Sequence, residues 1–369
     1  MPDIVVIGAG MAGASAAHFL ARRFDVLLLE REDQPGYHTT GRSAALYTQA
    51  YGNAAIRALT VASKPFFDAP PDGFSEVPLL TPRGLVLFGR PDQSESLDGA
   101  FRDGRRFVPE IRMLDSEEAC RLIPAFRPDY VAGGVYEPKA ADIDVHAMHR
   151  GFLRGVPLRR NAEVEGLDRR PGGGWRVALR GGGEVEARIV VNAAGAWADE
   201  LGTLAGAAPV GLVPKRRTAF TFPAETGEWP MAVDVDEQFY FKPESGRALG
   251  SLADETPSPP CDAQPEEIDV AMAVDRIERA TSFSIRRIER RWAGLRSFVA
   301  DKTLVAGFDP DVPGFFWCAG QGGYGIQTAP AMGRAVASLA AGDGWPAELD
   351  DLGLRESVLS PARFRGGAS

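Results

Sequence analysis

The stretch Ile4-Val5-Val6-Ile7-Gly8-Ala9-Gly10-Met11-Ala12-Gly13 decides how this chain folds. Its first four residues are β-branched, which predicts a central parallel strand buried on both faces. Gly8 permits a tight turn, Gly10 lets the backbone approach a phosphate, and Gly13 allows close packing on the strand. The alanine-rich run from Ala12 to Arg23 predicts a helix, whose N-terminal N–H groups bind anions. The order of these pieces predicts a site for a dinucleotide pyrophosphate.

A second strand, Val26 to Leu29, ends at Glu30. An acid at this distance accepts hydrogen bonds from ribose hydroxyls and repels a 2′-phosphate, which disfavours NADP. Beyond Arg31, residues 34–45 are small, polar and backbone-accessible, which suits a segment lying along a ribityl chain and a pyrophosphate. Two alternatives stay open, a βαβ unit without a nucleotide and an ordinary polar loop.

The C-terminal part carries a second glycine-rich segment, Gly320-Gln321-Gly322-Gly323-Tyr324-Gly325-Ile326-Gln327. Strands are predicted before it at Leu304 to Phe308 and Gly314 to Ala319. A helix is predicted from Thr328 to Ala341, with Pro330 in its first turn. Its positive N-terminal dipole end suits a flavin, on which negative charge develops during reduction. A cofactor held from both ends of a chain is typical of resident FAD rather than of a visiting nicotinamide.

The composition of the chain argues against several other classes of function. The chain has 369 residues, 44% hydrophobic and 25% charged, which is ordinary for a soluble protein of two compact units. A net charge of −9 argues against nucleic acid and anionic membrane as partners. We expect no membrane segment and, because a strand begins at Ile4, no signal peptide. The three cysteines have no disulfide or metal-site spacing, and His146 and His149 lack a third ligand, so we expect a cytoplasmic protein without a metal site.

Other segments extend the plan of the fold. Ile189 to Trp197 is a buried strand that runs into small residues. Further strand-rich stretches lack regular intervening helices and indicate a mainly antiparallel sheet inserted into the nucleotide domain. These stretches are Leu79 to Gly89, Gly133 to Tyr136, Val213 to Phe222 and Phe239 to Lys242.

The ordered motifs resemble those of the FAD-dependent D-amino-acid oxidase and dehydrogenase superfamily over essentially the whole chain. Within it, the bacterial D-arginine dehydrogenases are the most similar branch. The residues that carry the resemblance are the first glycine motif with Glu30, Gln34–His38, Gly41–Ala45, Asn192–Trp197, Pro214–Arg217, Phe239–Pro243, Trp292–Ser297 and Gly320–Gln327.

This resemblance implies an α/β fold with a glutathione-reductase-like FAD (Rossmann) domain and an inserted, mainly antiparallel α+β substrate domain. The FAD domain is expected to comprise residues 1–78, 143–212 and 305–369, and the substrate domain residues 79–142 and 213–304. FAD is expected to be noncovalent, because Cys318 does not match the attachment position of the sarcosine oxidase branch. The implied FAD-binding residues are Gly8, Gly10, Met11, Ala12, Gly13, Glu30, Arg31, Thr40, Gly41, Arg42, Ser43, Ala44, Ala45, Val164, Ala194, Gly195, Trp197, Arg296, Gly322, Gly323, Tyr324, Gly325, Ile326 and Gln327.

The implied reaction is hydride transfer from Cα of an amino acid to flavin N5, followed by hydrolysis of the imino acid to a 2-keto acid and ammonia. The implied carboxylate ligands are Arg217, Arg296, Tyr240 and, on a mobile loop, Tyr51; the backbone at Gly323 would meet the amine. A guanidinium matches a carboxylate with two parallel donors. Strand alternation alone favours Arg216 as the inward residue, whereas the resemblance selects Arg217.

The substrate side chain is expected to meet Leu46, Thr48 and Leu85. The D-arginine branch has a histidine and a glutamate where this chain has Leu46 and Leu85. Because a leucine cannot pair with a guanidinium, the departures predict a preference for apolar or aromatic side chains.

Several alternatives remain at this point. A glycine- or sarcosine-type secondary-amine oxidase shares the fold and the carboxylate clamp, and a flavoprotein relaying electrons without amine oxidation is a third class. The D configuration rests on the resemblance alone. The electron acceptor, oxygen or a quinone-type carrier, is left open.

Overall fold

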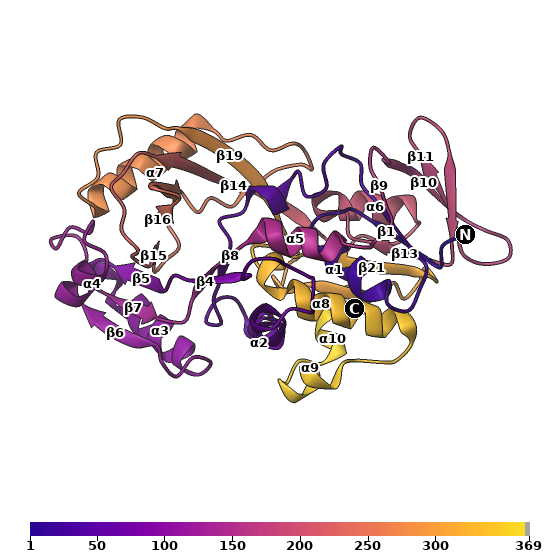
Figure 1. Cartoon of the computed structure of the whole chain (residues 1–369), viewed down its shortest axis with the longest axis horizontal. Coiled ribbons are helices and arrows are strands. Elements are labelled where there is room, and N and C mark those ends of the chain that lie inside the picture. The colour runs from indigo at the N-terminus through magenta and orange to yellow at the C-terminus, as the bar shows by residue number, and fades with distance from the viewer. Residues whose placement is uncertain (366–369) are drawn as a thin grey trace.

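The computed structural model describes residues 1–365, and in it the two ends of the chain meet in one sheet (Figure 1). Neighbouring strands are parallel except at the edge pair β20–β21. The six strands, in spatial order, are β20 (Val305–Phe308), β21 (Phe315–Ala319), β13 (Ile189–Asn192), β1 (Ile4–Ile7), β2 (Val26–Leu29) and β9 (Leu158–Arg159). Strands about 300 residues apart in sequence therefore belong to one sheet, with only β13 between β1 and β21, as the two glycine motifs predict.

Strand β1 is buried on both faces because its side chains alternate between two layers. Ile4 and Val6 pack toward the helices α1 (Met11–Leu20) and α8 (Gly325–Ala341). Val5 and Ile7 pack on the other side, against the small antiparallel sheet and α6 (Ala198–Leu204). That sheet is formed by β10 (Val164–Arg169), β11 (Trp175–Leu179) and β12 (Glu184–Ala187). The continuous apolar run is confirmed as a strand covered on both faces.

A nine-stranded sheet forms the other half of the molecule (Figure 1). Its neighbours are antiparallel except for the parallel pair β5–β15. The order is β18 (Thr256–Pro257), β14 (Val213–Phe222), β17 (Arg247–Ser251), β16 (Tyr240–Glu244), β15 (Met231–Asp234), β5 (Leu85–Gly89), β7 (Gly133–Glu137) and β6 (Arg112–Asp115), with β19 (Arg290–Phe298) beside β14. The predicted class, a Rossmann-type sheet with a mainly antiparallel second sheet, is confirmed.

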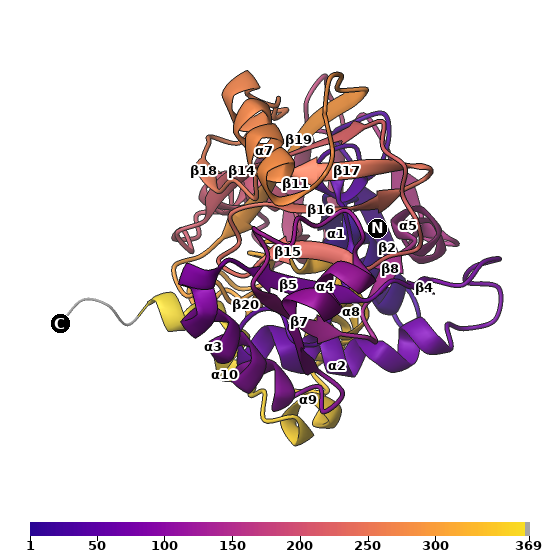
Figure 2. The same ribbon diagram turned by 90° about the vertical axis from the view of Figure 1, so that its left-hand side faces the viewer.

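The expectation that regular helices are missing between these strands is wrong. Figure 2 shows α7 (Glu267–Ala280) beside β14, and α3 (Ser94–Arg105) and α4 (Ser116–Leu122) beside β5 and β7. In α3 only Leu97 and Gly104 are buried, so its sequence carries no apolar stripe that would reveal a helix.

Two further boundaries differ from the prediction. The stretch from Leu79 to Gly89 is two strands, because Gly84 turns the chain at a φ of +75° between β4 (Leu80–Pro82) and β5. Helix α8 begins at Gly325, so that Pro330 lies in its second turn rather than its first.

The remaining elements connect these layers. Strand β4 joins a three-stranded sheet with β3 (Leu46–Tyr47) and β8 (Ala141–Ile143). The other helices are α2 (Ala54–Asp68), α5 (Val145–Leu153), α9 (Ala347–Asp351) and α10 (Glu356–Leu359). None of the helices within residues 1–365 has the length and apolar character that a membrane crossing requires. The assignment of residues to two domains stays a prediction.

Candidate active site

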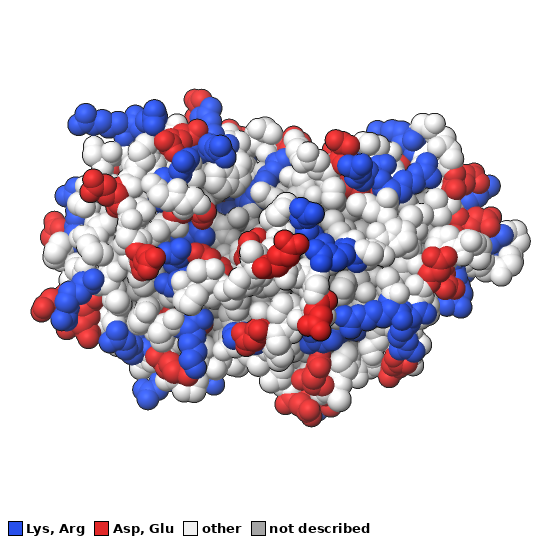
Figure 3. All heavy atoms as spheres, viewed as in Figure 1, with Lys and Arg blue, Asp and Glu red and all other residues white. Residues whose placement is uncertain are grey.

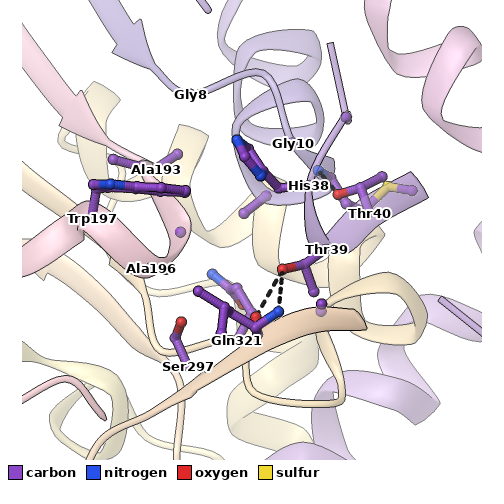
Figure 4. A pocket seen from close by; sticks show the side chains of 18 of the residues that line it. Gly8, Gly10, His38, Thr39, Thr40, Ala193, Ala196, Trp197, Ser297 and Gln321 are labelled. Atoms are coloured by element: carbon purple, nitrogen blue, oxygen red, sulfur yellow. Dashed lines mark hydrogen bonds between the residues drawn. The ribbon is translucent and has the colours of Figure 1, made fainter. Parts of the chain in front are cut away.

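A long cavity of about 280 Å³ runs from the glycine turn after β1 to the face of the nine-stranded sheet. Its walls come from segments distributed over almost the whole chain, including β1, β2, β14, β19 and the start of α8. Figure 4 shows Gly8 and Gly10 on one side of it and Ser297 and Gln321 on the other. The predicted site residues that line it are Gly8, Gly10, Met11, Ala12, Glu30, Arg31, Thr40, Arg42, Ser43, Ala44, Val164, Ala194, Gly195, Trp197, Arg217, Tyr240, Arg296, Gly322, Gly323, Gly325 and Ile326.

The glycine turn is packed so tightly that side chains are excluded from it. Gly8 has a φ of +101°, and a Cβ there would lie 2.4 Å from the carbonyl oxygen of Ala193. A Cβ on Gly13 would lie 1.8 Å from the carbonyl oxygen of Gly8. The backbone N–H of Ala9 donates to Glu30 Oε2 at 2.9 Å, which ties the turn to the end of β2. The turn therefore keeps bare backbone at the cavity wall, as a phosphate site requires.

His149, for which the sequence predicts no metal-binding role, forms a hydrogen bond to this turn. Its Nε2 lies 2.8 Å from the carbonyl oxygen of Ala9. Burial lowers the pKa of His149, which favours the neutral ring. Since a carbonyl oxygen only accepts, Nε2 carries the proton that is donated to Ala9.

The polar segment 34–45 connects the turn to the nine-stranded sheet. Thr40 accepts a hydrogen bond from the N–H of Met11 at 2.9 Å. The hydroxyl of Thr39 donates to the carbonyl of Leu295 on β19 at 2.8 Å and accepts from the N–H of the same residue at 3.3 Å (Figure 4). This segment is therefore a structural bridge along the cavity and not a free polar loop.

The indole of Trp197 forms another part of the cavity wall. The guanidinium of Arg31 lies 4.8 Å from its ring centroid, and the ring of His38 lies 4.8 Å away at an interplanar angle of 52°. Cation–π and ring contacts hold the indole in place. A flat apolar wall of this kind suits a nucleobase.

Two guanidinium groups lie at the sheet end of the cavity. They come from the neighbouring strands β14 and β19, in which Arg217 pairs with Gly294 and Arg296 with Lys215. Arg217 Nε donates to the carbonyl of Asp254 at 2.9 Å, and its Nη2 lies 3.5 Å from Glu255 Oε1. Burial, and then the charge of Arg296, lower the pKa of Arg217.

The Nη2 group of Arg217 is buried and has no hydrogen-bond partner within residues 1–365. An unsatisfied buried donor on a charged group is costly, and a second cation beside it raises that cost. The two groups together therefore fit an anion that enters the cavity.

Arg216, which alternation favours, faces the opposite side of β14. Its Nη1 lies 3.0 Å from Glu266 and its Nη2 lies 2.9 Å from Asp269 on α7. The expectation that Arg216 points toward the substrate was wrong. Both faces of β14 are largely buried, one against α7 and the other at the cavity, so alternation alone does not tell them apart. Arg217 lines the cavity instead, and its role as a carboxylate ligand stays a prediction.

Tyr51 lies near the two arginines without lining the cavity. Its hydroxyl donates to Glu237 Oε2 at 3.4 Å, and its ring centroid is 5.0 Å from that of Tyr324. Burial raises the pKa of Tyr51, and the charge of Arg296 opposes this increase. The phenol is therefore a neutral donor at ordinary pH.

The other predicted residues that do not line the cavity are Gly13, Gly41, Ala45, Leu46, Thr48, Leu85, Tyr324 and Gln327. Leu46 and Leu85 share one apolar cluster with Tyr240, so the structure brings these three together. Gly41 donates its N–H to the carbonyl of Gly36 at 2.8 Å, which shapes the polar segment. Thr48 is hydrogen-bonded to Glu137 and to Gln327.

Several residues that line the cavity were not named singly as site residues, although Gly36 to Thr39 belong to the segment that was predicted to lie along the cofactor. They are Ile7, Leu29, Gly36, Tyr37, His38, Thr39, Ala162, Glu163, Ala193, Ala196, Glu200, Leu201, Leu204, Ala219, Gly294, Leu295, Ser297, Gly320 and Gln321. Most are immediate neighbours of predicted residues, so the motifs themselves could have revealed them. Glu200, Leu201 and Leu204 carry no motif, and only the fold brings α6 to the wall.

Gly323 leaves the space that the Arg296 guanidinium occupies. A Cβ at this position would lie 2.8 Å from Arg296 Nη1 and 3.1 Å from its Cζ. We expect Gly323→Ala to displace the guanidinium and to raise KM for an anionic substrate, measured on the flavin-loaded fraction, about tenfold, roughly 1.4 kcal/mol. Steady-state kinetics and the flavin absorbance check this. Gly99→Ala, where a Cβ meets nothing within 4 Å, is the control, and equal KM values in the two variants would contradict the expectation.

Comparison with known proteins identifies the family of this chain. Residues 3–339 match the profile of the DAO family, described as FAD dependent oxidoreductase. Dimethylglycine dehydrogenase of Rattus norvegicus is 26% identical over 256 residues, which are 66% of this chain and 30% of that protein. The chain thus spans less than a third of that relative. FAD-dependent oxidoreductase domain-containing protein 1 of Bos taurus is 23% identical and is covered over 80% of its length by 91% of this chain.

Solved structures share the fold. L-proline dehydrogenase from P. horikoshii superimposes with a TM-score of 0.83 at 21% identity, over 99% of this chain and 98% of that one. Glycine oxidase from Geobacillus kaustophilus gives a TM-score of 0.81 at 22% identity, over 92% and 94% of the two chains. At these identities the likeness concerns the fold alone.

Proposed function

This chain belongs to the DAO family of FAD-dependent oxidoreductases, and on that basis we propose that it oxidatively deaminates D-amino acids with apolar or aromatic side chains. The observation that carries the proposal is the buried Arg217 Nη2 beside the like-charged Arg296. This Nη2 has no hydrogen-bond partner in residues 1–365, and Glu255, 3.5 Å away, is shared with Lys215 and Lys302. A carboxylate is the ligand that neutralises such a pair and satisfies its donors.

FAD fits the residues of the cavity. The bare backbone of the Gly8–Gly13 turn and the start of α1 suit its pyrophosphate, and Glu30 at the end of β2 suits a ribose. The glycine-rich start of α8 and strand β19 would flank the ring system. When bound, FAD supplies an acceptor for two electrons. Noncovalent binding remains part of the proposal.

The side chains of the sheet then bind and orient the substrate. Arg217 and Arg296 hold the carboxylate, and Tyr240 lies on the same wall of the cavity. Fixing the carboxylate fixes the direction of the Cα–H bond, which is catalysis by positioning. Burial next to two cations lowers the pKa of the substrate amine, so that the amine is neutral when Cα loses hydride. The imino acid then takes up water and yields a 2-keto acid and ammonia.

The side-chain preference rests on the apolar cluster that contains Leu46, Leu85 and Tyr240. A cationic side chain meeting these residues would be desolvated, and the carboxyl group opposite Leu85, that of Glu137, is already hydrogen-bonded to Thr48 and Gln49. The pattern departs here from the D-arginine dehydrogenases that the sequence resembles. Kinship with that branch, and the D configuration, are parts of the proposal rather than of the family assignment.

The substrate preference can be measured directly. Anaerobic addition of D- and L-enantiomers to the FAD-loaded enzyme should bleach the flavin with the D-forms of leucine, methionine and phenylalanine. We expect kcat/KM for D-leucine to exceed that for D-arginine by tenfold or more, about 1.4 kcal/mol, because arginine would bury its charge. D-Arginine leading by tenfold, or bleaching by L-enantiomers alone, would show that the proposal is wrong.

A second candidate is the oxidation of a secondary or tertiary amine that carries a carboxylate. It is favoured by the similarity to dimethylglycine dehydrogenase. The same assay with sarcosine, dimethylglycine and proline separates the two candidates. The oxidant that returns the flavin to its starting state is left open.

A further inference from the structure

Glu137 is a buried carboxyl group for which the proposed reaction has no use. It is the last residue of β7 and is only 4% exposed. In the pairing of β5 with β7 it lies directly opposite Leu85. Cross-strand partners share one face of a sheet, so Glu137 lies on the face that carries Leu85 and the cluster with Tyr240.

The carboxyl group is turned toward the segment 48–50 and not toward the cavity. Glu137 Oε2 accepts a hydrogen bond from the Thr48 hydroxyl at 2.6 Å, and Oε1 accepts from the N–H of Gln49 at 3.1 Å. Burial raises the pKa of Glu137, and these hydrogen bonds oppose the increase. Both carboxyl oxygens of Glu137 therefore accept hydrogen bonds from two consecutive residues, Thr48 and Gln49.

Gln327 holds the same stretch from the other side. Its Oε1 accepts a hydrogen bond from the N–H of Thr48 at 3.3 Å, and its Nε2 donates to Thr60 Oγ1 at 3.0 Å. Gln327 belongs to the first turn of α8, directly after Gly325 and Ile326 on the cavity wall. Thr48 is thus bonded to the sheet through Glu137 and to the cavity wall through Gln327.

The stretch held in this way leads within three residues to Tyr51. The Tyr51 hydroxyl donates a long hydrogen bond of 3.4 Å to Glu237 Oε2, and Arg296 and Arg217 lie near enough for their charges to act on its pKa. Gly52 follows with a φ of +86°, so the chain turns immediately afterwards. The position of the Tyr51 hydroxyl therefore depends on how firmly residues 48–50 are fixed.

We propose that Glu137 is a positioning residue that, together with Gln327, fixes residues 48–50 so that the Tyr51 hydroxyl can turn from Glu237 to an anion held by Arg217 and Arg296. Glu137 touches neither substrate nor cofactor and acts through Tyr51. The inference rests on the proposed function for the identity of the anion, a substrate carboxylate.

The test uses the full-length, FAD-loaded enzyme and four variants, Glu137→Leu, Glu137→Gln, Tyr51→Phe and the double variant Glu137→Leu/Tyr51→Phe. Glutamine keeps an acceptor for Gln49 and can donate to Thr48, whereas leucine fills the space without either bond. The readouts are KM and kcat for the best substrate, Kd for benzoate from the flavin spectrum, and amide hydrogen exchange across residues 48–53.

Glu137→Leu should raise KM and the benzoate Kd about tenfold, change kcat less, and accelerate exchange across 48–53 at least tenfold. Glu137→Gln should stay within about twofold of the parent in all readouts. In the Tyr51→Phe background, Glu137→Leu should change KM and Kd by no more than about twofold, because the group through which it acts is gone. Asp309→Leu is the matched control, since it removes a buried carboxyl that bonds Trp317 and Arg365 instead. It should lower Tm and leave Kd and exchange at 48–53 unchanged.

Unchanged exchange and Kd in Glu137→Leu, or an undiminished effect in the Tyr51→Phe background, would overturn the inference. Should Glu137→Leu fail to fold, Thr48→Val decides, because it deletes the hydrogen bond to Glu137 alone. Threefold or larger increases in Kd and exchange would support the inference, and smaller ones would contradict it. Exchange requires no turnover, so a flavin that no amino acid reduces would overturn the proposed function while exchange still decides on Glu137.

Discussion

Replacing Arg217 by methionine should lower kcat/KM for amino acids by about a thousandfold, roughly 4 kcal/mol, while the enzyme keeps its flavin. Truncating one partner of a buried charge pair costs about 2–5 kcal/mol, because the other charge is left unpaired. Here the unpaired group would be the substrate carboxylate, which would retain only Arg296 and the tyrosine hydroxyls. Most of the loss should appear in KM, with a further loss in kcat because the Cα–H bond is no longer oriented.

The neighbouring residue provides the control for this prediction. Arg216→Met removes an equally long cation from the same strand, but its partners are Glu266 and Asp269 on α7. It should lower Tm, since a buried acid loses its partner, and change kcat/KM by less than about threefold. A loss of kcat/KM in Arg216→Met as large as in Arg217→Met would mean that the carboxylate clamp has been assigned wrongly.

This pair of residues also shows where reasoning from the sequence ends. Alternation along a strand tells which residues share a face, but not which face meets the cavity when both are buried. In β14 the face of Phe220 and Phe222 packs under α7, and the more polar face meets the cavity. The less hydrophobic face of this strand, whose residues 217–222 are all buried, therefore carries Arg217, and only the resemblance pointed to it.

The glycine motifs were readable because their requirements are local. The φ of +101° at Gly8, and the Gly8 carbonyl oxygen that a Cβ on Gly13 would meet at 1.8 Å, both arise within the turn itself, so these glycines could be assigned from the sequence. His149 and Thr39 are of another kind, because each acts on backbone 140 or more residues away in sequence. A lone histidine or threonine has no sequence pattern that reveals such a partner. The same is true of Glu137, whose contacts are about 90 residues away.

Replacing Gly8 by alanine should abolish FAD binding, with the apparent Kd rising at least a hundredfold. Two effects act together at this position. A φ of +101° strains any residue with a Cβ by about 1–2 kcal/mol, and the new Cβ would lie 2.4 Å from the carbonyl oxygen of Ala193. Because that oxygen is backbone at the end of β13, β1 and β13 would have to separate at the cavity wall. Gly155→Ala separates the two effects, since Gly155 has a φ of +75° with nothing within 4 Å of a new Cβ. The Gly155→Ala variant should have a slightly lower Tm and an unchanged flavin affinity.

Flavin fluorescence titration of both variants measures the apparent Kd for FAD. Normal affinity in Gly8→Ala would show that this turn does not bind the pyrophosphate.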